Sequence, residues 1–163
     1  MSEAVLTTLV DEQDAWRVLK SKAPQLHAGS ARLLHHPFAG FQFQVPQPAR
    51  RQRAAHVLVD YYSGKAFLSD PWRLEDAAGL DLAKVKDPKW NTIDFETARH
   101  KAAALVRTAS MRKAKLAWRG GVKEQSCVRT VWKPNWMLQA RIADQDYRIM
   151  VDGLNGGYFV IGG

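Results

Sequence analysis

The residues of this chain that could do metal, acid–base or nucleophilic chemistry are few and scattered. His35 and His36 are adjacent, His56 and His100 lie elsewhere, and Cys127 is the single cysteine. Neighbouring residues on a strand point to opposite faces, so His35 and His36 are poorly placed to share a metal ion. The sequence has no His-x-x-x-His, Cys-x-x-Cys or His-Glu-x-x-His spacing, and nothing around Cys127 indicates an activated nucleophile. We therefore expect no metal, no cofactor and no catalytic residue.

Basic residues are the stronger functional signal. The chain carries 24 Lys and Arg against 16 Asp and Glu, which gives a formal net charge of +8. This balance favours either an anionic partner or a solvated basic surface. The basic residues form two clusters, and Trp118 and Trp132 flank the second one, which runs from Arg107 to Lys123. Positive charge beside aromatic rings could hold phosphates and stack bases. The candidate contacts for an anionic partner are Arg50, Arg51, Arg53, Arg107, Arg112, Lys113, Lys115, Arg119 and Lys123.

A short pattern occurs twice and predicts how the elements that position these residues are arranged. The first copy reads LLHHPFAGFQFQV at 33–45 and HVLVDYYSGKAFL at 56–68. The second reads TVWKPNWMLQARI at 130–142 and RIMVDGLNGGYFVI at 148–161. Self-similarity of this kind is typical of repeated structural units.

The Val-Asp-x-x-(Ser/Asn)-Gly element of the pattern has a backbone explanation. Gly64 and Gly156 suit a turn position with positive φ. Asp60 and Asp152 precede that turn, where a carboxylate accepts hydrogen bonds from backbone N–H groups. We interpret these four residues as turn-bracing and structural rather than catalytic.

Hydrophobic periodicity predicts the same succession of elements in both halves. Helices are predicted at 11–23 and 94–113, each beginning at an aspartate that can cap it. Pro37 and Pro134 each fall between two strand patterns and predict a bend there, because proline cannot donate to a sheet. The predicted strands are 31–36, 39–45, 54–60 and 65–69 in the first half, and 126–133, 136–143, 146–152 and 157–161 in the second.

The predicted fold is therefore α+β, with two tandem helix-plus-antiparallel-meander repeats and pseudo-twofold pairing. The first helix–sheet repeat takes residues 1–72, the second takes 94–163, and residues 73–93 connect them. The chain resembles the PepSY domain and its cystatin-like relatives. The resemblance is carried by a helix that is followed by a hairpin, in which V-D-x-x-(S/T/N)-G joins the two strands. The resemblance implies a small non-enzymatic module that binds or inhibits partners. The Gln-x-Val-x-Gly motif of protease-inhibiting cystatins is missing, since the nearest stretch, 42–46, reads QFQVP.

The expected localisation is cytoplasmic. The chain shows no signal-peptide pattern, no apolar run near the ~20 residues of a membrane span and no second cysteine for an internal disulfide.

The leading functional hypothesis is a non-catalytic binding or regulatory module that recognises another macromolecule, in the first place a protein, through sheet faces or edges. Homodimerisation through such an edge is a further expectation. The alternative is a nucleic-acid-binding protein that uses the basic helix and the arginine-rich hairpin tip. The second alternative is a small-ligand enzyme of unknown reaction, with a pocket lined by His35, His56 or Asp60.

Overall fold

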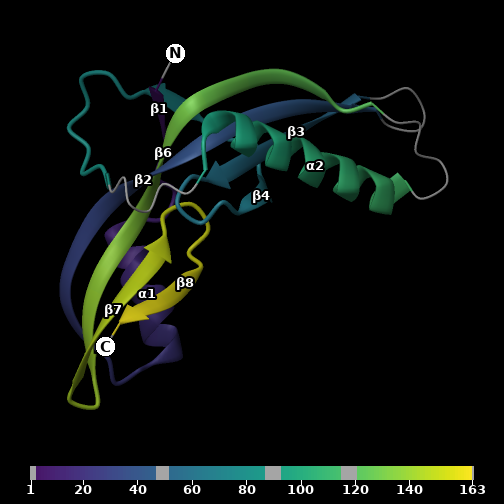
Figure 1. Ribbon diagram of the computed structural model, residues 1–163. Helices are drawn as coiled ribbons and strands as arrows, with labels where there is room; N and C mark the ends of the chain where they lie inside the picture. The colour runs from purple at the N-terminus through teal and green to yellow at the C-terminus, as the bar shows by residue number, and fades with distance from the viewer. Residues whose placement is uncertain (1–2, 47–51, 87–92, 115–120, 163) are drawn as a thin grey trace.

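The computed structural model describes residues 3–46, 52–86, 93–114 and 121–162. Within these ranges it contains one eight-stranded mixed sheet and two helices, α1 (Glu12–Lys22) and α2 (Phe95–Ala114) (Figure 1). The strands are β1 (Glu3–Leu6), β2 (His27–Pro46), β3 (Gln52–Asp60), β4 (Ala66–Ser69), β5 (Leu74–Asp76), β6 (Lys123–Ile142), β7 (Gln145–Asp152) and β8 (Tyr158–Gly162).

Two long antiparallel strands form the spine of the sheet. β2 and β6 have 20 residues each, and they pair from His27 opposite Arg141 to Gln44 opposite Lys123. In Figure 1 they run side by side as a single arch. β3 and then β4 extend the sheet beyond β2, while β7 and then β8 extend it beyond β6. β1 pairs with β6 in parallel, and β5 pairs with β1.

The prediction of two tandem helix-plus-meander repeats is wrong. β2 from the first half and β6 from the second half are direct neighbours in one continuous sheet, and the β1–β6 pair makes that sheet mixed rather than antiparallel. A repeated pattern predicts similar elements, but it does not predict which strand satisfies the backbone groups along each edge. Here the longest edges of the two halves satisfy each other.

The helices also bridge the two halves. Ala15 and Leu19 of α1 lie in a buried cluster with Leu138 of β6 and with Ile149 and Val151 of β7, so the first helix covers strands of the second half. The second helix likewise covers strands of the first half, where its cluster joins Ala98, Ala102 and Val106 to Phe41, Phe43, Val57 and Val59.

Local signals describe the helix ends well. The predicted helices are confirmed to within one residue at each end. Asp11 caps α1 by accepting from the backbone N–H of Asp14 at 2.7 Å, and Asp94 accepts from that of Thr97 at 2.8 Å. The latter bond holds the pKa of Asp94 below its usual value, because it stabilises the charged carboxylate.

The strands predicted separately on the two sides of Pro37 and Pro134 are each one long strand, because β2 and β6 run through the prolines without interruption. Each proline stands where its strand changes neighbour along one edge. On β2, His35 bonds to the segment at 83–85, whereas pairing with β3 begins at Phe38. Pro37 lies between these two partners, where a missing N–H leaves no acceptor unsatisfied. Pro134 has the same place on β6, between the partners β1 and β7.

The segment predicted as a connection, 73–93, adds to the sheet where it is described. It contributes β5 and the parallel bridge between Lys84 and His35. Strands before, within and after this segment therefore belong to the same sheet. No helix in the described part of the chain is long and apolar enough to cross a membrane.

Candidate binding groove

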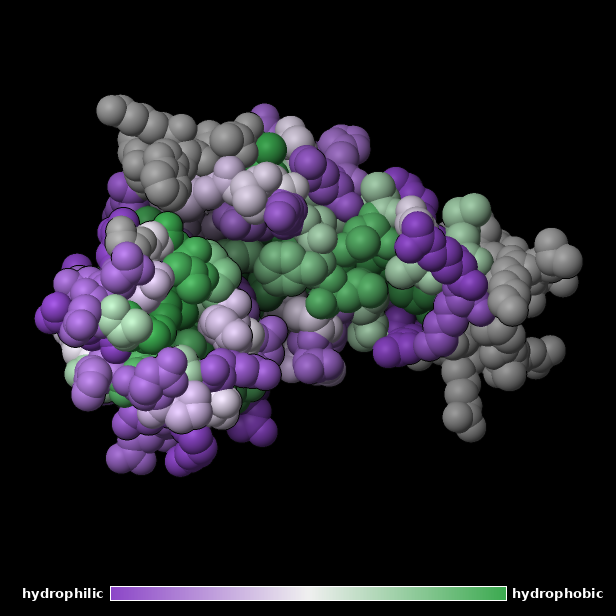
Figure 2. All heavy atoms as spheres, turned by 90° about the horizontal axis from the view of Figure 1, so that it is seen from below, coloured by the Kyte–Doolittle hydropathy of each residue, from purple (hydrophilic) through white to green (hydrophobic). Residues whose placement is uncertain are grey.

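A groove of about 860 Å³ opens where the β3–β4 and β7–β8 hairpins approach the β2–β6 pair. β2 contributes His36 and Phe38 to it, and β6 contributes Lys133 and Asn135. Hydrophobic side chains extend across the hollow between the β7–β8 side and the α2 side of the molecule (Figure 2). The hairpins supply mostly apolar walls, which include Phe67, Met150, Tyr158, Phe159 and Ile161.

The groove lies on the sheet face that the helices leave uncovered. Along β2, Ala39, Phe41 and Phe43 belong to the cluster under α2. Because side chains alternate along a strand, His36 and Phe38 face the other side. The curvature of the sheet and the two hairpins make this uncovered face concave.

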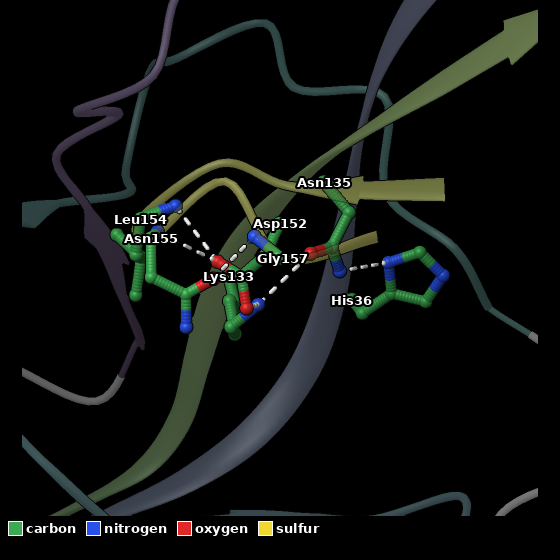
Figure 3. A network of polar contacts seen from close by, with 7 residues as sticks. All are labelled: His36, Lys133, Asn135, Asp152, Leu154, Asn155 and Gly157. Atoms are coloured by element: carbon green, nitrogen blue, oxygen red, sulfur yellow. Dashed lines mark hydrogen bonds and ion pairs between the residues drawn. The ribbon is translucent and has the colours of Figure 1, made fainter. Parts of the chain in front are cut away.

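A buried lysine anchors the polar centre of the groove (Figure 3). Lys133 is only 4% exposed, and its Nζ donates to Asp152 Oδ2 at 2.7 Å and to Asn135 Oδ1 at 2.8 Å. A buried ammonium group without such acceptors would be strongly unfavourable. Asp152 and Asn135 are therefore needed to keep this cation inside the fold.

The two aspartates predicted as turn braces occupy matching positions in the structure. Asp60 Oδ1 accepts from the backbone N–H of Tyr62 at 2.8 Å, and Asp152 Oδ1 accepts from that of Leu154 at 2.8 Å. Gly64 and Gly156 adopt φ of 72° and 77° in these turns. Asp152 has a further task, because its second oxygen holds Lys133.

The same network fixes the protonation state of His36. Lys133 can only donate, so the amide oxygen of Asn135 must face it and the amide nitrogen must face His36. That nitrogen lies 2.9 Å from His36 Nδ1, which must then accept, so the ring proton is on Nε2. Figure 3 shows that the second ring nitrogen points away from the network.

Electrostatics favour the same neutral ring. Burial is the largest cause of the lowered pKa of His36. The negative charge of Asp60 raises this pKa, and the positive charge of Lys133 lowers it further. A neutral imidazole with one N–H therefore lines the groove.

The other histidines of the enzyme hypothesis are not brought to this site. His35 is buried, its Nδ1 has no partner among the described residues, and alternation directs it to the helix-covered face. His56 packs edge-on against Trp72, with ring centroids 4.8 Å apart. Burial lowers the pKa of both imidazoles. Among the residues that the structure describes, no three His, Cys, Asp or Glu side chains are grouped to hold a metal ion.

The predicted basic contacts are only partly within the described ranges. Arg50, Arg51, Lys115 and Arg119 lie outside them. The others are exposed. They are Arg53 at the start of β3, Arg107, Arg112 and Lys113 on α2, and Lys123 at the start of β6.

Sequence reasoning missed the centre of the groove. Lys133 stands between Trp132 and Pro134 in an otherwise apolar stretch, and a lone charge in such a strand was the available signal. Asn135 is two residues along the same strand, but the counter-ion Asp152 belongs to β7, so the ion pair could not be read from the sequence.

No family model, curated protein or solved structure matches this chain. The resemblance to PepSY and cystatin-like domains therefore stays a prediction.

The network predicts unequal roles for the two turn aspartates. Asp152→Ala should lower the free energy of unfolding by about 3 kcal/mol, because it leaves Lys133 buried without its counter-ion. Asp60→Ala, the matched control, removes turn hydrogen bonds but no buried ion pair, and should cost about 1 kcal/mol. Urea unfolding monitored by circular dichroism gives both values.

A rescue variant tests the stated reason. Lys133→Met combined with Asp152→Asn leaves no buried charge and should recover most of the lost stability. Equal losses for Asp152→Ala and Asp60→Ala would contradict a special role for the ion pair.

The lowered pKa of His36 predicts a pH dependence with a defined sign. In the unfolded chain this imidazole takes up a proton near pH 6.5, at roughly its ordinary pKa, whereas in the fold it stays neutral to lower pH. The unfolded state therefore binds more protons as the pH falls. Stability should be fully present above about pH 6.5 and decrease below it, until the lower folded-state pKa is reached.

His35 and His56 contribute with the same sign, because their pKa values are lowered too. His36→Asn should therefore reduce the slope of unfolding free energy against pH between pH 7.5 and 5 without abolishing it. An unchanged slope in urea titrations would show that His36 does not titrate as described.

Proposed function

We propose that this protein is a non-catalytic binding protein whose groove takes an extended apolar segment of a partner protein. The observation that carries the proposal is the groove itself, with aromatic walls, a fixed polar centre and an opening on the uncovered face of the sheet. Sites of this composition are typical of binding surfaces, because apolar walls supply affinity and a few fixed polar groups supply specificity.

The walls expose more aromatic surface than a solvated sheet needs. Phe67, Tyr158 and Phe159 are 37%, 43% and 58% exposed. All three line the groove, so a ligand bound there would cover them. Phe67 is held in place by an edge-on contact with Phe38, with ring centroids 5.7 Å apart. Contiguous exposed apolar surface of this kind marks interaction sites in soluble proteins.

The shape of the surface favours an extended segment. A second cavity, of about 490 Å³, adjoins the groove and shares Phe67, Lys133, Asp152 and Asn155 with it. It continues toward Trp72 and the loop after β4. A strand-like peptide can contact both cavities, because it spans ~3.3 Å per residue.

Charge defines the chemistry of that segment. Asp60, Asp152 and Lys133 line the groove, so its centre carries one more negative than positive formal charge, although the whole chain is basic. An acidic segment would be repelled there, whereas a neutral or basic one would not. The Nε2–H of His36 is a donor for a carbonyl oxygen of the bound backbone.

Random peptides displayed on phage test the proposal. We expect the full chain to select peptides with apolar residues at alternating positions and without acidic residues. Phe67→Ser should weaken binding of a selected peptide about tenfold or more, because it removes an aromatic wall. Fluorescence anisotropy with the synthetic peptide measures the affinity.

Met111→Ser is the matched control, because Met111 is also exposed but belongs to α2 on the covered face. It should leave the affinity unchanged. If no peptide is enriched, or if both variants bind alike, the groove is not the binding site.

A second candidate function, nucleic-acid binding, is favoured by one observation. Arg53 and Lys123 begin β3 and β6 and pair with neighbouring residues of β2, Val45 and Gln44. The C-terminal end of α2 lies at the same end of the sheet (Figure 1) and carries Arg112 and Lys113. Basic side chains from three elements therefore gather at one end of the molecule and suit a phosphate backbone.

This candidate predicts a charge effect that depends on position. Replacing both Arg112 and Lys113 by Ala should weaken binding of labelled single-stranded DNA and flatten the salt dependence by about one unit of slope per lost phosphate contact. Replacing Lys20 and Lys22 on α1 removes the same charge elsewhere and should have little effect. The absence of any DNA complex at low salt in anisotropy measurements would eliminate this function.

A further inference from the structure

The free edge of β8 is unusual for a sheet edge. β8 pairs with β7 on one side, and no described strand pairs with its other side. Its residues Phe159 and Val160 are 58% and 55% exposed although they point to opposite faces. Native proteins usually protect such an edge with charge, proline, a bulge or a covering element. β8 has no charged residue and no proline, and its single register shift against β7 comes after Val160, near its C-terminal end.

Hydrogen-bond alternation shows which groups this edge presents. Asp152 donates its backbone N–H to the carbonyl of Gly157, and the ladder continues with Met150 opposite Phe159. In an antiparallel pair, hydrogen-bonded and non-hydrogen-bonded positions alternate. Phe159 therefore bonds inward to β7, while the N–H and C=O groups of Tyr158 and Val160 point outward.

The charge of the chain limits what can cover this edge in a second copy. Two copies, each with a net charge of +8, repel each other unless the contact surface is neutral. β8 meets this condition, because none of its side chains is charged at neutral pH. β5 does not, since it includes Glu75 and Asp76, and the short β4 is flanked directly by the charged residues Lys65 and Asp70.

The sequence of β8 is also self-complementary about its centre. In an antiparallel pair of two β8 strands with Val160 opposite its own copy, Phe159 stands opposite Ile161. The register of β8 against β7 shifts after Val160, so Gly162 lies outside the regular pairing. The outward groups of Val160 then bond to each other across the twofold axis. Aromatic and β-branched residues opposite each other stabilise antiparallel pairs, and no like charges meet.

From these observations we infer that two copies of this chain form a dimer by pairing their β8 strands antiparallel, with the twofold axis at Val160. The pairing joins the sheets of two copies into one and covers an edge that pairs with no described strand of the same chain. The dimer contact is made by the backbone of the β8 edge, and side chains of β8 also line the groove. The Phe67→Ser variant tests peptide binding alone, because Phe67 lies on β4.

Sedimentation velocity of the full chain over a range of concentrations tests the dimer. The expected species has twice the 18.4 kDa mass of the chain. Val160→Pro removes one outward N–H and should raise the dimer dissociation constant tenfold or more, whereas Val160→Thr keeps that N–H and should leave a dimer. A chain that stays monomeric at all concentrations, or a Val160→Pro variant that dimerises like wild type, overturns the inference.

Cross-linking gives a second measurement that does not depend on the proline variant folding. In a Cys127→Ser background, Val160→Cys should form an intermolecular disulfide under mild oxidation, because opposed residues of an antiparallel pair lie within disulfide reach. Leu68→Cys, on the free edge of β4, is the matched control and should not. Equal cross-linking at both positions, or none at position 160, contradicts the β8 pairing.

Discussion

The antiparallel pairing of β2 with β6 is the interaction on which the other features of this protein depend. Each strand has 20 residues, and each offers one long edge to the other. Without this pairing both strands would expose unsatisfied backbone groups along that edge. With it, β3–β4 and β7–β8 become two extensions of one sheet. The helices then cover one face, where the apolar residues of both halves are gathered.

The groove is a consequence of this arrangement. His36 of β2 stands directly opposite Lys133 of β6 in the ladder, and both side chains lie on the face without helices. Asp152, which stands opposite Asn135 on the neighbouring strand β7, supplies the counter-ion of Lys133. Each group then orients the next: Asp152 holds Lys133, Lys133 sets the amide of Asn135, and Asn135 sets the tautomer of His36. A single buried cation thus organises the polar centre of an otherwise apolar hollow.

The two functional proposals use different parts of the same sheet. A curved sheet with covered and uncovered faces offers a concave surface, where Phe67 and Phe159 provide apolar contact. The sheet also has edges, and the outer edge of β8 has no partner among the described strands. Face binding depends on side chains, whereas edge pairing depends on backbone groups. β8 takes part in both, with its side chains in the groove and its backbone at the edge.

The sequence by itself determined the features that depend on neighbours within a few residues. Capping by Asp11 and Asp94 fixed the helix starts, and the glycines at 64 and 156 adopt the positive φ that their turns require. It also located most strand segments, because period-two alternation is a local pattern, but it missed the short strands β1 and β5. It did not predict how the strands assemble, since two halves with similar elements could form two separate sheets or share one sheet.

Only the tertiary structure decided which strands are neighbours, and with that the site. His36 and Asn135 are 99 positions apart in the chain, and their contact exists because β2 lies beside β6. The burial of Lys133, the tautomer of His36 and the free edge of β8 all follow from that neighbour choice. Such contacts depend on which edges satisfy each other's hydrogen bonds across the whole chain, and residue spacing carries no record of that choice.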